Sequence, residues 1–152
     1  MSFVESVLND HKNIERELVE LDTIIEDSEE TINYPNLLYV LKTVYNIWDE
    51  HEQKEDSVFK IFKKMKIKIP VEKMIFEHKS LRQYREDLEK TFASNDASKI
   101  KNAVRSDLKK IIIKLREHIE NEENTLWMLP MEDIFSVEEL NKMDRLFNNL
   151  EK

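Results

Sequence analysis

Two histidines of this 152-residue chain occur in the same local context, with a glutamate directly before each and a second glutamate four residues after it. The two segments contain Glu50, His51 and Glu55, and Glu117, His118 and Glu122. On a helix, residues four apart share one face, so each imidazole would lie beside a carboxylate. Imidazole and carboxylate groups together bind iron, zinc or manganese, and they do not select among these metals. The repeated segment therefore predicts two metal-binding pairs.

The other two histidines, His11 and His78, follow the same arrangement. Adding 67 to the residue number maps His11 onto His78, His51 onto His118 and Glu55 onto Glu122, which indicates a repeated helical hairpin. In an up-down bundle, two residues lie at one height when the loop between them is midway in sequence. The midpoints between successive histidines are 31, between 64 and 65, and 98, and all fall in polar stretches. The four histidines are therefore predicted to converge at one level, pointing inward.

The elements that must position these side chains are four long segments with the apolar spacing of half-buried helices. They run over residues 4–25, 37–62, 74–92 and 104–129. Ser94 and Asp96 are candidates for capping the fourth helix. Ser136 and Glu139 resemble a capping box that would open a short fifth helix. We therefore expect an all-α, up-down four-helix bundle with a short C-terminal helix, forming a single domain over residues 1–152.

Composition excludes several other classes of function. The chain has no cysteine, which rules out disulfides and thiolate metal sites, and no glycine, which rules out glycine-rich phosphate loops. The net charge of −8 argues against binding to nucleic acid. No apolar run approaches the length that crosses a membrane, and the first residues do not resemble a signal peptide. A soluble, cytoplasmic protein is the expectation.

Imidazoles and carboxylates gathered in a bundle core would be costly to bury without a partner, and metal ions provide one. The predicted metal ligands are His11, His51, Glu55, His78, His118 and Glu122. Two metals fit this set best, each taking two histidines, with both glutamates spanning the pair. A bridging oxide or hydroxide would complete five ligands on each metal and leave one position open for a small molecule.

Two other metal-binding patterns fail on this sequence. Ferritin-like di-iron bundles place a glutamate three residues before each ligand histidine. The residues at that offset here are Leu8, Trp48, Ile75 and Leu115. The His-Glu-x-x-His pattern of zinc proteases fails because position 55 is a glutamate.

The order His…His-x-x-x-Glu…Glu-His…His-x-x-x-Glu resembles the hemerythrin family, specifically its HHE cation-binding branch. Supporting segments are Asp10-His11, Glu77-His78-Lys79-Ser80-Leu81, His118-Ile119 with Glu122-Glu123, and Leu126-Trp127-Met128-Leu129-Pro130. The resemblance spans residues 4–150 and implies a non-haem di-iron site in a four-helix bundle. It also implies binding of dioxygen, nitric oxide or peroxide-level species.

The chain departs from the oxygen-carrying hemerythrins at two positions. Those proteins have a further histidine one turn before the third-helix ligand, where this chain has Met74. They place the last carboxylate five residues after its histidine, at Glu123 here, whereas the internal repeat favours Glu122. A site with four histidines resembles the branch linked to repair of iron centres damaged by nitrosative stress.

These observations leave three functions open. The leading hypothesis is binding or sensing of dioxygen or nitric oxide at two non-haem iron ions, with iron delivery as an addition. The second is a di-iron enzyme, namely a peroxidase, an oxidase, a nitric-oxide-consuming enzyme or a repair protein. The third is a metal store, or a structural bundle filled with zinc. The sequence leaves the oligomeric state unknown.

Further side chains are candidates for support of the metal ligands. The acids directly before the four histidines are Asp10, Glu50, Glu77 and Glu117, and each could accept the far ring N–H of a histidine on a neighbouring helix. Asp56 and Glu123 are expected to be solvated. Glu15 lies one turn after His11, although a salt bridge suits it better. Met74 lies near the level of the histidines and is expected to pack in the core with Tyr45, Trp48 and Trp127.

A lysine-rich stretch follows the second predicted helix. It contains Lys60, Lys63, Lys64, Lys66 and Lys68. These side chains could dock an acidic redox partner protein, but a solvated helix end is the simpler interpretation.

Overall fold

The computed structural model describes residues 3–27, 31–64, 66, 70–127 and 135–150, without the side chains of Leu126, Trp127, Phe147 and Leu150. The first three long helices are α1 (Phe3–Glu26), α2 (Tyr34–Lys64) and α3 (Val71–Ala93). The fourth rod is continuous and consists of α4 (Ala97–Asn102), the π-helical turn η1 (Ala103–Asp107), α5 (Leu108–Glu122) and the π-helical turn η2 (Glu123–Trp127). The short C-terminal helix is α7 (Val137–Leu150).

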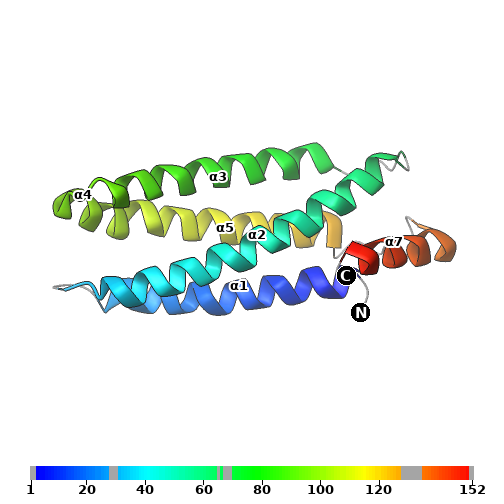
Figure 1. Cartoon of the computed structure of the whole chain (residues 1–152). Coiled ribbons are helices and arrows are strands. Elements are labelled where there is room, and N and C mark those ends of the chain that lie inside the picture. The colour runs from blue at the N-terminus through cyan, green and yellow to red at the C-terminus, as the bar shows by residue number, and fades with distance from the viewer. Residues whose placement is uncertain (1–2, 28–30, 65, 67–69, 128–134, 151–152) are drawn as a thin grey trace.

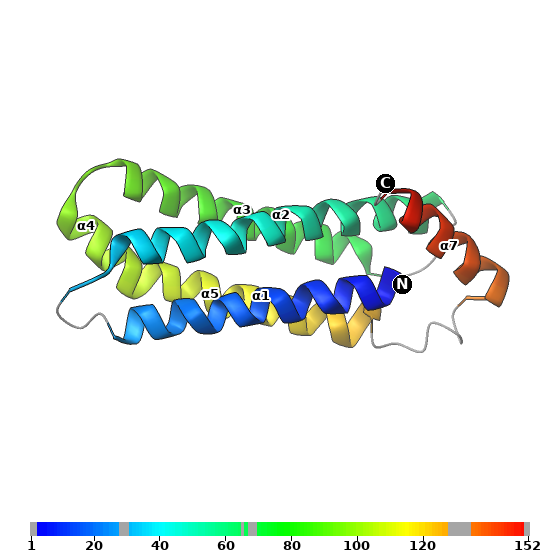
Figure 2. The same cartoon turned by 60° about the horizontal axis from the view of Figure 1, so that its bottom comes forward.

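The long helices run up and down beside one another and form a bundle (Figure 1). Helices α1 and α2 pack together, as do α3 and α5, and α1 also contacts α5. Helix α7 lies at the end where α1 begins and α2 ends, and it contacts both (Figure 2). The predicted all-α bundle with a short C-terminal helix is confirmed. Among the described residues, no helix has the length and apolar character that a membrane span requires.

Polar side chains cap helix ends at positions that the sequence predicted. The carboxylate of Asp96 accepts hydrogen bonds from the backbone N–H groups of Ser98 and Lys99, both at 3.1 Å, and so begins α4. The predicted capping box is present, because Ser136 Oγ accepts from Glu139 N at 3.1 Å and Glu139 Oε1 accepts from Ser136 N at 3.0 Å. Ser94 instead ends α3.

Two apolar clusters fill the core, and they lie at different heights. The larger one, which we call the upper cluster, contains Ile14, Trp48, Leu81 and Leu115 among its buried residues. The smaller one, the lower cluster, contains Val7, Val58 and Met74, and α7 adds Met143. On α1, α2 and α3 the positions between these two sets carry His11, His51 with Glu55, and His78, and on α5 His118 and Glu122 follow Leu115 of the upper cluster. The apolar clusters therefore enclose a polar layer from above and below.

The connections agree with the height argument, with one small difference. Positions 31 and 98 are midpoints between successive histidines in the sequence. Position 31 lies between α1 and α2, as expected. Position 98, however, lies in the first turn of α4, because the chain turns at Ser94 to Asp96. The π turn η1 compensates in part, since i→i+5 bonding fits more residues into one turn and shortens the rod.

Candidate metal centre

The six predicted ligand side chains come together in the polar layer. Their exposed fractions are 0% for Glu55 and Glu122, 2% for His78, 3% for His11, 4% for His51 and 5% for His118. One histidine comes from each long helix, and the glutamates come from α2 and α5. The predicted convergence of the four histidines is confirmed. Because all six groups are almost fully removed from water, their polar atoms depend on one another or on a bound cation.

The potential ligand atoms form two groups of four. The first quartet is His11, His51, Glu55 and Glu122, and the second quartet is Glu55, His78, His118 and Glu122. Within each quartet, one atom from every residue lies within 4.8 Å of the others. Both glutamates belong to both quartets. The arrangement therefore has two adjoining positions for a cation, each facing two imidazoles and two carboxylates.

Distances within the quartets show that the inner nitrogens point toward common centres. In the first quartet, the Nε2 atoms of His11 and His51 are 3.0 Å apart, and His51 Nε2 is 2.7 Å from Glu55 Oε1. In the second quartet, His78 Nε2 is 3.3 Å from Glu122 Oε1, and the same carboxylate oxygen pairs with His118 Nε2. The lone pairs that would bind a metal thus face inward on all four helices.

The outer ring nitrogen of every histidine meets an acid. His51 Nδ1 donates to Asp10 at 3.2 Å and His118 Nδ1 donates to Glu77 at 2.6 Å, as expected for these two acids. The other two partners differ from the prediction. They are Glu123, 3.0 Å from His11 Nδ1, and Asp56, 3.5 Å from His78 Nδ1. An outer acceptor fixes the tautomer and orientation of a ligand histidine.

Two of the four predicted acids, Glu50 and Glu117, do not lie at the outer nitrogen of a histidine. Glu50 is exposed, and Glu117 pairs with Lys114 at 3.7 Å on the surface. The side chains of Asp56 and Glu123 are partly exposed, at 41% and 34%, as expected, and they also lie at the outer nitrogens of His78 and His11. The internal repeat carried the missing signal, because Asp10 maps onto Glu77 and Asp56 maps onto Glu123 at the same offset of 67 as the histidines.

The remaining candidates lie outside the cluster. Glu15 pairs with Arg116 at 2.9 Å on the surface, which agrees with the expected salt bridge. Met74 is fully buried in the lower cluster, where it packs as a core residue. The side chain of Trp127 and the residue Lys68 lie outside the described part of the chain, whereas Lys63 forms a surface ion pair with Glu72 at 2.6 Å.

One buried acid was missed by sequence reasoning. Glu52 is only 3% exposed, and its carboxylate accepts hydrogen bonds from Trp48 Nε1 at 2.7 Å and from Arg82 Nε at 2.8 Å. Arg82 also lies 3.6 Å from the Asp56 carboxylate, which in turn is 3.5 Å from His78 Nδ1. A chain of polar contacts thus leads from the upper cluster to a predicted ligand. Trp48 is more than an apolar core residue.

The charges of the cluster favour a bound cation. Burial opposes protonation of His51, but Glu55 and Asp10 outweigh it and raise the pKa of His51 to about 10. Burial likewise opposes protonation of His78, but Asp56 and the two shared glutamates raise its pKa to about 12. Burial works to raise the pKa of Glu122, yet contacts with Glu55 and the histidines hold that pKa well below its usual value.

The six buried side chains are suited to bind metal ions because their charges already favour a cation. Protons on the imidazoles neutralise the buried carboxylates, and a metal cation would replace those protons while using the same inward-facing atoms. Four imidazole nitrogens and two carboxylates suit iron, zinc and manganese alike.

The fold and the cluster define a class of protein, namely a four-helix bundle whose core carries histidines and glutamates suited to hold metal ions. Residues 2–129 match the Hemerythrin HHE cation binding domain. Because the match covers most of the chain, the protein belongs to the hemerythrin HHE cation-binding family. Comparisons with curated proteins and with solved structures gave no match.

Proposed function

We propose that the protein is a non-haem di-iron protein that binds or senses dioxygen or nitric oxide in the core of its bundle. The observation that carries this proposal is the pair of buried quartets that share Glu55 and Glu122. One iron ion would be held by His11 and His51 and the other by His78 and His118, with the two glutamates serving both.

Burial supports a small ligand over a large substrate. None of the six residues is more than 5% exposed, and apolar clusters lie on both sides of the polar layer. A diatomic molecule fits such a core, whereas a peptide, sugar or nucleotide does not. When bound, a pair of iron ions supplies reversible redox chemistry and an affinity for such molecules.

The chain's own residues would hold and tune the centre. Asp10, Glu77 and Glu123 hold three of the imidazole rings through hydrogen bonds at their outer nitrogens, and Asp56 lies 3.5 Å from the outer nitrogen of His78. These acids also make the imidazoles more basic and thus better ligands. As part of the same proposal, the protein works in the cytoplasm, a reducing compartment that suits a cysteine-free chain.

The experiment is metal analysis combined with visible spectroscopy. Protein purified from iron-replete cells is expected to contain two iron ions per chain. After anaerobic reduction, dioxygen or nitric oxide should produce a new visible spectrum, and flushing with argon should reverse the dioxygen spectrum. His51→Ala should lose one iron ion, while the matched surface variant Glu50→Gln should behave as the wild type.

Three results would point elsewhere. A reduced, iron-loaded protein whose spectrum does not respond to either gas would refute gas binding. Sustained turnover of hydrogen peroxide or nitric oxide would favour the enzyme alternative. A colourless protein that contains two zinc ions under iron-replete conditions would favour a structural or storage role.

A further inference from the structure

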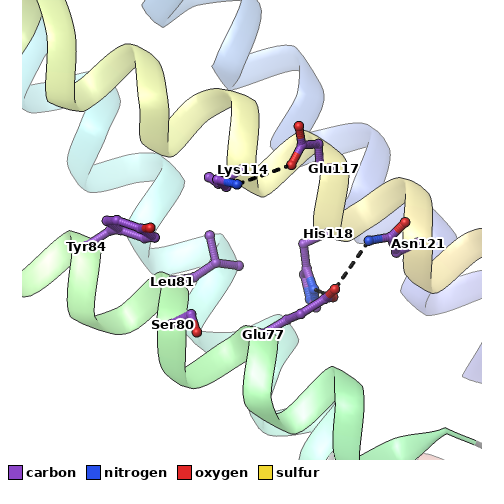
Figure 3. A pocket seen from close by; sticks show the side chains of 8 residues that line it. All are labelled: Glu77, Ser80, Leu81, Tyr84, Lys114, Glu117, His118 and Asn121. Carbon is purple, nitrogen blue, oxygen red and sulfur yellow. Dashed lines mark hydrogen bonds and ion pairs between the residues drawn. The ribbon is translucent and has the colours of Figure 1, made fainter.

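A cavity of about 230 Å³ lies between α3 and α5, on the side of the second quartet. Its lining includes His118, so it reaches a predicted metal ligand that is otherwise buried. Figure 3 shows Glu77 of α3 beside His118 and Asn121 of α5, and Lys114 with Glu117 on the preceding turn of α5. The cavity therefore adjoins both the candidate metal centre and the protein surface.

Two carboxylates line the cavity, and they differ in their exposure to solvent. The Glu117 side chain is 59% exposed, and the Glu77 side chain is 22% exposed. One Glu77 oxygen accepts from His118 Nδ1 at 2.6 Å and the other accepts from Asn121 Nδ2 at 3.2 Å. Carboxylates placed successively in this way suit a divalent cation that exchanges its water ligands for protein oxygens.

The ammonium group of Lys114 at the mouth of the cavity is held weakly. Lys114 Nζ lies 3.7 Å from Glu117, and both side chains are about half exposed, at 48% and 59%. Exposed ion pairs of this kind contribute little to stability, so an arriving dication could displace the lysine.

Charge distinguishes this side of the centre from two others. The outer acceptor Asp10 is paired with Lys54 at 3.2 Å, and the outer acceptor Asp56 has Arg82 at 3.6 Å. A divalent cation approaching either acid would meet a fixed positive charge. Glu77, in contrast, has the neutral amide of Asn121 as its second partner. The lysine on this route, Lys114, is at the mouth and pairs with Glu117, whereas Lys54 and Arg82 lie against Asp10 and Asp56 themselves.

We propose that the cavity between α3 and α5 is the uptake route for divalent metal cations, with Glu117 as the capture residue at its mouth and Glu77 as the next ligand before the quartets. This inference rests on the proposed metal centre but concerns the rate of loading, not the final occupancy. Lys114 opposes loading, because its charge reduces the attraction of the mouth for a cation.

The test is stopped-flow uptake of Co²⁺ by metal-free protein at low ionic strength, followed by its visible absorption. A unit charge about 10 Å from a dication in water changes the local cation concentration roughly fourfold. Glu117→Gln should therefore slow uptake about fourfold, and Lys114→Gln should accelerate it by a similar factor. Added salt should reduce both differences. Equilibrium binding should remain at two Co²⁺ ions per chain in each variant.

Glu120→Gln is the matched control, because Glu120 is an exposed acid on the same helix and is not part of the cavity lining. It changes the net charge as Glu117→Gln does, but from about 15 Å the same charge is worth roughly 2.5-fold, so Glu120→Gln should slow uptake less than Glu117→Gln does. Equal rates for the Glu117 and Glu120 variants, with full occupancy, would overturn the uptake route and leave the metal centre intact. Failure of the wild type to bind Co²⁺ would overturn both proposals.

Discussion

Replacing Glu122 with glutamine is the most direct test of the shared-ligand arrangement. The change preserves the shape of the side chain and removes its charge. Glu122 is fully buried, belongs to both quartets, and lies 3.7 Å from His11, 3.3 Å from His78 and in contact with His118. Loss of its charge should therefore weaken both metal positions, whereas loss of a histidine should weaken only one.

The size of the effect on the metal-free protein follows from burial. Removing one partner of a buried charge pair costs about 3–5 kcal/mol. For a domain of this size, each kcal/mol shifts the melting temperature by about 2–4 °C. Glu122→Gln should thus lower the melting temperature by about 6–20 °C. Bound metal at a thousandfold excess over its Kd adds about 4 kcal/mol to the wild type, and the variant should lose most of this gain as well.

The assay combines thermal melts, with and without chelator, and metal analysis of the same samples. Wild type should contain two metals per chain, His51→Ala about one, and Glu122→Gln fewer than one. Glu120→Gln provides the control for a change of charge on an exposed part of α5. A Glu122→Gln protein that retains two metals and melts as the wild type does would refute the assignment of Glu122 to both quartets.

Three further outcomes are expected. The pKa values of His51 and His78 are raised from 6.5 to about 10 and about 12, so their stabilising charge is fully present below pH 6.5 and is lost as the pH rises. The melting temperature of the metal-free protein should accordingly fall between pH 6.5 and 10. A melting temperature that does not change with pH would contradict this. Acid should release the metals below about pH 5 as protons compete for the imidazoles, and dialysis followed by metal analysis that finds two metals at pH 4 would argue against histidine ligation. Glu52→Gln should cost about 1–3 kcal/mol in urea unfolding and shift the fluorescence of Trp48, whereas Glu50→Gln should change neither, and equal unfolding curves would disprove a structural role for this buried acid.

Much of the fold was predictable because the chain repeats simple local rules. Apolar residues spaced three and four apart specify each helix and its buried face. Asp96 and the pair Ser136 and Glu139 mark helix ends through side-chain groups that accept or donate to free backbone atoms. Antiparallel helices joined by short turns then fix the relative heights of residues, and this is why the spacing of the four histidines predicts that they lie at one level.

The outer acceptors could not be chosen from one helix alone. Successive residues are turned by about 100° around a helix axis, so an acid next to a histidine faces a neighbouring helix on one side and solvent on the other. Neighbouring helices run in opposite directions, so the side of the helix that faces a neighbour changes from one helix to the next. Consequently, on α1 and α3 the acid at the outer nitrogen is the residue before the histidine, Asp10 or Glu77. On α2 and at the start of η2 it is the residue after the glutamate, Asp56 or Glu123.

The sequence by itself determined that this chain forms a helical bundle and that its histidines and two glutamates face the core, because helical periodicity is a property of consecutive residues. Only the tertiary structure decided which imidazoles share a quartet, which acids hold their outer nitrogens, and why Glu52 is buried. Those pairings join different helices, and they depend on how each helix is rotated against its neighbours. No spacing within a single helix specifies that rotation.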